Sequence, residues 1–151
     1  MSAVKRKGAA EPPARSDTLE TTAAIICDNV RHEVTGKQIL IGVYTGTILV
    51  PSFPAALTLA LWLEQEPRRT GTVPFSVRLA TDRGTVLFSA EMEFEILAAE
   101  EPATLVFGGI RVPLTDPCAL HVEVREGDAA WRTVKRKRVA RRPDPESAPA
   151  A

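Results

Sequence analysis

Residues 86–96 read VLFSAEMEFEI, and this stretch decides the fold class. Apolar side chains alternate with glutamates along it, at Met92, Phe94 and Ile96 against Glu91, Glu93 and Glu95. A period of two places each set on one face of a β-strand. A helix, with its period of about 3.6 residues, would scatter the glutamates around its axis. The stretch therefore predicts a strand with one core face and one solvated face.

The same alternation extends outward in both directions. Upstream, Leu57, Leu59, Leu61 and Leu63 alternate with other residues, and Phe75, Val77 and Leu79 do the same further on. Short apolar runs follow at 104–107, 110–114, 119–125 and 131–139. Turn residues recur about every 8–12 positions, which is typical of antiparallel β proteins. We expect an all-β fold, an antiparallel two-sheet β-sandwich of about eight or nine short strands.

Length and composition favour one domain with disordered termini. A chain of 151 residues suits a single domain. Residues 1–20 are rich in Ala, Pro and charged residues and predict a disordered N-terminal tail. Proline-rich residues 140–151 predict a disordered C-terminal tail, which leaves 21–139 for the sandwich. No apolar run approaches the ~20 residues that span a bilayer, and no apolar segment follows the basic start, so we expect a cytoplasmic protein.

The run from Ile26 to Val50 predicts a hairpin. Residues 26–34 alternate as one strand, and Thr35-Gly36 supplies a turn position with positive φ. The next strand, KQILIGVY at 37–44, would place Ile39, Ile41 and Val43 inward. Gly42 on its opposite face indicates a bulge or a close neighbour.

Polar and aromatic side chains gather around this hairpin. The candidates for partner binding are Asp28, Arg31, Glu33, Lys37, Tyr44 and Phe53. Strand alternation puts Asp28 on the opposite face from Arg31 and Glu33, which argues against a convergent catalytic pair. Two interpretations stay open. The charges form cross-strand ion pairs of roughly 0.2–1 kcal/mol each that fix the register, or the hairpin docks a protein partner or a second copy of the chain.

A basic strip follows an acidic body. Residues 21–131 hold eight Lys and Arg against fourteen Asp and Glu, a net charge of −6, whereas 132–142 hold seven cations and no anion. The candidates for nucleic-acid binding are Arg132, Lys135, Arg136, Lys137, Arg138, Arg141 and Arg142, with Trp131 available for stacking. The alternatives are protection of an edge strand against aggregation and docking of a protein. The glutamates at 91–95 are expected on a solvated face or against a basic partner, including this strip.

No motif for catalysis or metal binding stands out. Cys27 and Cys118 have no Cys-x-x-Cys spacing and are expected to be buried thiols in strands. His32 and His121 lack the spacing of a zinc site, and no Gly-x-Ser-x-Gly elbow occurs. Trp62, opposite the leucines, is a candidate platform for a small ligand. We expect a protein that is not an enzyme and that needs no cofactor or metal.

One resemblance adds to this interpretation. Residues 27–54 contain Cys-Asp-x-x-Arg-x-Glu, Gly-Lys, Gly-Val-Tyr and Pro-Ser-Phe-Pro in that order. This run resembles the N-terminal segment of an uncharacterised family of small bacterial and phage-associated proteins with no assigned activity. The resemblance implies a domain of unknown function in a bacterial protein. We expect a non-enzymatic protein-binding or assembly module whose partner is a protein or a second copy, and not a membrane; the alternative is nucleic-acid association through 132–142.

Overall fold

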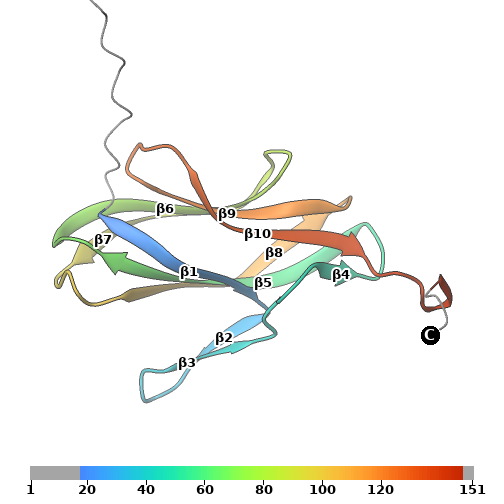
Figure 1. The fold of residues 1–151 in the computed structure, drawn as a ribbon, viewed down its shortest axis with the longest axis horizontal. Coiled ribbons are helices and arrows are strands. Elements are labelled where there is room, and N and C mark those ends of the chain that lie inside the picture. Colours follow the sequence, from blue (N-terminus) through green and yellow to red (C-terminus); the bar gives the residue numbers. More distant parts are fainter. Residues whose placement is uncertain (1–17, 148–151) are drawn as a thin grey trace, which may run out of the picture.

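The computed structural model describes residues 18–147, and almost all of them lie in or between β-strands (Figure 1). The strands are β1 (Leu19–Cys27), β2 (Asn29–His32), β3 (Gln38–Ile41), β4 (Ile48–Val50), β5 (Ala55–Pro67), β6 (Gly71–Thr81), β7 (Val86–Ile96), β8 (Ala103–Leu114), β9 (Cys118–Glu126) and β10 (Arg132–Arg141). A short 3-10 turn, η1 (Pro145–Ser147), follows β10. Within residues 18–147 no helix has the length and apolar character needed to cross a membrane.

Two sheets pack face to face and enclose the core (Figure 1). One has three strands in the order β1-β5-β8, and the other has five in the order β4-β10-β9-β6-β7. Strands β2 and β3 form a separate two-stranded hairpin. Leu61 of β5, Phe75 of β6 and Leu120 of β9 are at most 1% exposed and belong to the same core cluster. The predicted β-sandwich is confirmed, although residues 18–147 hold ten strands where about eight or nine short ones were expected, and β5 and β8 are 13 and 12 residues long.

The alternation along β7 has the predicted orientation. Met92 and Phe94 are half-buried, Ile96 is buried, and the glutamates between them are exposed. The Phe94 ring packs edge-on against Phe75 of the neighbouring β6, with centroids 6.3 Å apart. β7 is the last strand of its sheet, so its glutamates line a solvated face at a sheet edge.

One strand pairing departs from the antiparallel expectation. β4 pairs with the end of β10 in the parallel direction, from Ile48 opposite Val139 to Val50 opposite Arg141. The strands β5 to β9 lie between β4 and β10 in the sequence. No local turn therefore fixes the direction in which β4 and β10 pair. The remaining pairs of the two large sheets are antiparallel.

The predicted continuous strand over residues 26–34 is wrong, because it breaks at Asp28. The Asp28 amide donates to the carbonyls of Ile41 and Gly42, at 3.0 and 3.2 Å. These bonds bend the chain out of β1, in the three-stranded sheet, and into the hairpin. Gly36 has φ +88° and occupies the predicted turn position.

The folded domain is longer than 21–139 at both ends. Leu19 is fully buried, and β10 continues to Arg141 before the 3-10 turn at 145–147. The start of β1 is fixed by Glu126 of β9, whose carboxylate accepts the amide of Leu19 at 2.6 Å and that of Thr18 at 3.2 Å. Residues 18–20 and 140–147 are therefore structured where tails were expected; the tail predictions for 1–17 and 148–151 lie outside the described residues.

Candidate functional site

The β2–β3 hairpin begins where β1 ends, next to β5, and lies below the sandwich in the view of Figure 1. Its pairs run from Asn29 opposite Ile41 to His32 opposite Gln38. Gln38 fastens it to the body, because its side-chain carbonyl accepts the indole N–H of Trp62 on β5. The Gln38 amide also pairs with His32 Nδ1 at 3.3 Å. Trp62 is thus engaged by the hairpin and is not an open platform for a ligand.

Asp28 and Tyr44 meet at the base of the hairpin. The Tyr44 hydroxyl donates to Asp28 Oδ1 at 2.7 Å. Burial, followed by this bond to the carboxylate, raises the pKa of Tyr44 to about 12. Gly42 has φ +67°, and a Cβ there would collide with the Asp28 carboxylate. The close neighbour predicted at Gly42 is therefore Asp28.

The other charged candidates do not pair with one another. Glu33 and Lys37 close the turn through their backbones, N–H to carbonyl at 2.8 Å, and the Glu33 carboxylate accepts the Thr35 hydroxyl at 3.2 Å. In the described part of the chain, no ion pair joins Asp28, Arg31, Glu33 and Lys37. The interpretation as cross-strand ion pairs is wrong, and backbone pairing together with Trp62 holds the register.

The apolar side chains at positions 39, 41 and 43 point the other way from the prediction. Ile39, Ile41 and Val43 are 44%, 38% and 43% exposed, so their inward placement is wrong. Val30 and Leu40, which oppose each other, are the half-buried pair of the hairpin. The run Ile39-Leu40-Ile41 is apolar on both faces of one strand, and only one face meets the body. That uninterrupted run is the sequence signal for an exposed apolar face.

The aromatic candidates lie at the margin of the core. Tyr44 and Phe53 are both half-buried and pack against the core cluster. Arg31 is exposed and lies opposite Ile39, on the same face of the hairpin. Of the six predicted partner-binding residues, the structure brings together Asp28 and Tyr44, and places Arg31 beside the exposed isoleucines.

The basic strip is divided between two faces of β10. Arg132, Lys135 and Lys137 oppose the buried Val124, Val122 and Leu120 of β9 and so lie on the inner side of the sheet. Arg136 and Arg138 oppose His121 and Ala119 on the outer side. Arg141 forms an ion pair with Asp144 at 3.6 Å, and Arg142 lies beyond the strand with its amide bonded to Val50. The seven cations do not form one surface.

Trp131, the predicted stacking residue, already has partners. The guanidinium groups of Arg78 and Arg125 lie 4.1 and 4.5 Å from its ring centre. Arg78 also donates to Glu123 through Nε at 3.0 Å and Nη2 at 2.7 Å. These contacts make a polar cluster that stiffens the outer face of the five-stranded sheet.

One protein family matches most of the chain. A protein-family model for a family of unknown function, DUF6941, matches residues 22–134. The chain belongs to this family. The match runs from within β1 to within β10, so Lys135 to Arg142 lie outside it. Curated proteins include no significant match to the chain. This membership confirms that the chain belongs to an uncharacterised family, and it assigns no activity.

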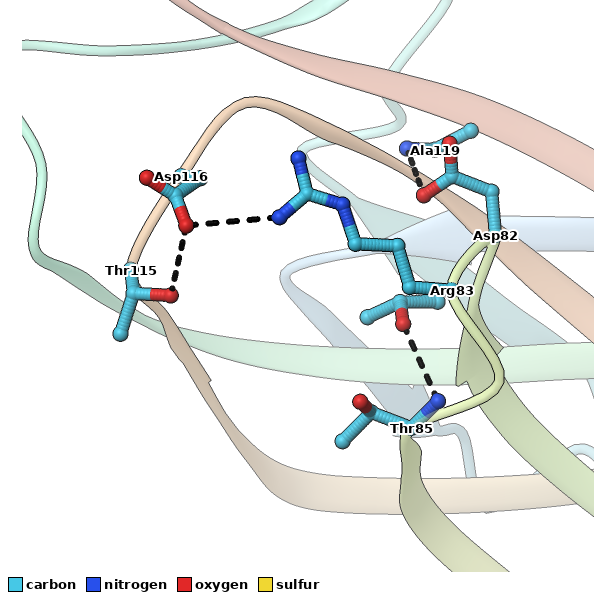
Figure 2. A network of polar contacts seen from close by, with 7 residues as sticks. Asp82, Arg83, Thr85, Thr115, Asp116 and Ala119 are labelled. Atoms are coloured by element: carbon cyan, nitrogen blue, oxygen red, sulfur yellow. Dashed lines mark hydrogen bonds and ion pairs between the residues drawn. The ribbon is translucent and has the colours of Figure 1, made fainter.

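Elsewhere in the DUF6941 domain, polar contacts connect the β6–β7 turn to the β8–β9 region. Figure 2 shows Asp82 and Arg83, in the β6–β7 turn, reaching the β8–β9 region: the Asp82 carboxylate accepts the Ala119 amide at 3.2 Å, and Arg83 lies 3.4 Å from Asp116. Within residues 18–147 no group of three or more His, Cys, Asp or Glu side chains is arranged to hold a metal ion.

Both thiols of the DUF6941 domain are free. Cys27, at the end of β1, is fully buried, as predicted, whereas Cys118 at the start of β9 is only half-buried. Burial raises the pKa of both thiols, and Asp82 adds to the effect at Cys118. A raised pKa lowers the thiolate fraction at neutral pH and leaves both cysteines weakly nucleophilic.

Proposed function

We propose that this protein is a non-enzymatic protein-binding module of the bacterial cytoplasm, which docks a partner on the solvent face of the β2–β3 hairpin. One observation carries the proposal: the exposed apolar side chains Ile39 and Ile41 follow each other on that face. The opposite face of the hairpin already meets the body of the domain. An apolar face on a projecting ribbon is stabilised when a second surface covers it.

The charges beside this face favour a particular kind of partner. Arg31 lies opposite Ile39, and Lys37 lies at the end of the turn; neither forms an ion pair within the described residues. A partner surface with an apolar centre and carboxylates at its rim would match both features. Glu33 is less available, because its carboxylate accepts the Thr35 hydroxyl.

Site-specific crosslinking tests the proposal. A photo-reactive amino acid in place of Ile41 should capture one host protein in nuclease-treated lysate. The Ile39→Ser substitution beside it should abolish the capture, whereas Leu49→Ser, at a residue 46% exposed on β4, should not. Val86 on β7 is 48% exposed. If the same photo-reactive residue in place of Val86 captured that protein as well as the residue at position 41 does, the proposal would be wrong. Capture of a second copy alone would assign the surface to self-assembly.

A second candidate function is nucleic-acid association through residues 132–142. The seven cations in that segment, without an anion, support it. Their division between two faces of β10 weighs against it, since fewer of them can reach one phosphate backbone. Arg136→Glu with Arg138→Glu should lower nucleic-acid affinity and the slope of its salt dependence; an unchanged slope removes this candidate.

A further inference from the structure

The edge of β10 is open over most of its length. β9 pairs with one side of β10 from Arg132 to Val139. On the other side, β4 pairs only from Val139 to Arg141. Over 133–138, no strand of the described residues pairs with that second side. The backbone N–H and C=O groups directed to this side can therefore accept an added strand.

A groove lies beside this open edge. Its volume is about 380 Å³, and it is lined by residues 21–25 of β1 and by Val134 and Lys135 of β10. Each strand has a β-bulge where it borders the groove, between Thr21 and Ala23 in β1 and between Thr133 and Lys135 in β10. Bulges bend a strand and interrupt its ladder. At the other side of the sandwich, by contrast, the rings of Phe88 and Phe107 meet at 5.4 Å between β7 and β8.

The open run is strongly cationic. Residues 133–138 contain four cations and no carboxylate. Lys135 and Lys137 lie on the inner side, towards β1, and Arg136 and Arg138 on the outer side. Burial lowers the pKa of Lys137, and the neighbouring Lys135 charge adds to the effect. Carboxylates brought beside these side chains would relieve that repulsion.

We propose that the open edge of β10 binds an extended acidic segment of another protein, which adds as a strand and places side chains in the groove between β1 and β10. Carboxylates at alternate positions of such a segment would face Lys135 and Lys137, or Arg136 and Arg138 on the outer side. This surface belongs to the five-stranded sheet, whereas the hairpin leaves the three-stranded one (Figure 1). The inference goes beyond the proposed function, and either can fail without the other.

A labelled peptide of alternating Glu and Val, about eight residues long, is the probe. Its binding to the full-length protein is followed by fluorescence anisotropy. Lys135→Glu with Lys137→Glu, or Arg136→Glu with Arg138→Glu, should weaken binding at least tenfold, with circular dichroism to verify the fold. The matched control, Arg83→Glu with Arg111→Glu, changes two exposed cations that lie outside both proposed surfaces, and it should leave the affinity unchanged.

A second probe separates strand addition from plain charge attraction without altering the protein. The same peptide is methylated on alternate backbone nitrogens, in either of the two phases. Strand addition predicts that one phase binds at least tenfold more weakly and the other almost normally, because only one set of amides faces β10. Equal binding of both phases overturns the proposal, as does the absence of peptide binding up to about 1 mM.

Other occupants of the edge give different results. An oligonucleotide that displaces the peptide, and binds more tightly than it at every salt concentration, would assign the edge to nucleic acid and overturn the proposal. Concentration-dependent dimerisation in sedimentation, lost on Glu91→Lys with Glu93→Lys, would assign it to β7 of a second copy and overturn it too. A protein that sediments as a monomer while it binds the peptide supports the proposal.

Discussion

The hydroxyl of Tyr44 donates a 2.7 Å hydrogen bond to the carboxylate of Asp28, at the junction where the chain leaves β1 for the hairpin. A second link runs beside it, since the Tyr44 amide donates to the carbonyl of Ile26 at 3.1 Å. The chain that enters the hairpin is therefore held to the chain that leaves it. The orientation of the proposed docking face depends on these bonds.

The first prediction concerns the ionisation of Tyr44. It is the single tyrosine of the chain, so ultraviolet absorbance reports its phenol alone. The native protein should titrate near 12, against about 10 for the unfolded chain. Because the folded pKa is the higher one, this contribution to stability is complete below the unfolded pKa and is lost as pH rises through the folded pKa.

Asp28→Ala tests the cause of that shift. It should move the native midpoint part of the way back towards the unfolded value. The return should be incomplete, because burial is the largest cause and the bond to Asp28 comes second. A midpoint near the ordinary tyrosine value in the unmutated native protein would contradict the assignment.

The second prediction concerns Gly42. An alanine there meets both a φ of +67° and the Asp28 carboxylate, so Gly42→Ala should lower the free energy of unfolding by about 1–2 kcal/mol or more. Gly46→Ala is the matched control, since no atom lies within 4 Å of its Cβ position, and it should change stability by less than about 0.5 kcal/mol. Urea denaturation measures both; equal effects would refute the argument.

The third prediction concerns Glu126. Glu126→Ala leaves the buried amide of Leu19 without its acceptor, and should lower the free energy of unfolding by about 1–3 kcal/mol. Glu126→Gln keeps a carbonyl acceptor and should lose less. Hydrogen exchange of the Leu19 amide should accelerate in the alanine variant, while that of the Leu120 amide, in the core of β9, should follow only the global change. An unchanged rate at Leu19 would exclude this role of Glu126.

The fourth prediction concerns the order in which Cys118 and Cys27 react. A disulfide reagent should modify Cys118 in the native protein first, because Cys118 is half-buried and Cys27 is fully buried. Both should react more slowly than a free thiol, since burial raises both pKa values. Cys118→Ala assigns the phases: the fast phase should vanish and the remaining one should follow global unfolding. A fast phase that persists in this variant would show that Cys27 is accessible.

Sequence alternation predicts the parts of this fold in which burial acts on one side of a long strand. The glutamates of β7 and the leucines of β5 have the orientation that their spacing indicates. The hairpin does not, because it belongs to neither large sheet, and which face of Ile39-Leu40-Ile41 meets the body depends on a bond from Trp62, far along the chain. The parallel β4–β10 pairing joins residues far apart in the sequence, and no local residue pattern indicates it. The same is true of the bulges in β1 and β10.

The candidate site was predicted as a set of residues and not as a geometry. Asp28 and Tyr44 both belong to the predicted set, yet their bond joins residues 16 positions apart, across a break that strand alternation does not reveal. One of the two interpretations paired the charges of Asp28, Arg31, Glu33 and Lys37 with one another. The turn satisfies Glu33 locally instead. Alternation along β10 separates Lys135 and Lys137 from Arg136 and Arg138, but the bulge between Thr133 and Lys135 places Arg132 on the inner side, which alternation alone does not indicate.

The three-residue strand β4 sets a limit on anything that lies along β10. Its parallel pairing occupies the outer edge of β10 from Val139 to Arg141, and the Arg142 amide adds a bond to Val50. An incoming chain must therefore stop at Arg138. At about 3.3 Å per residue, the open edge over 133–138 is roughly 20 Å long. β4 therefore limits how far an added strand can extend towards the C-terminal end of β10.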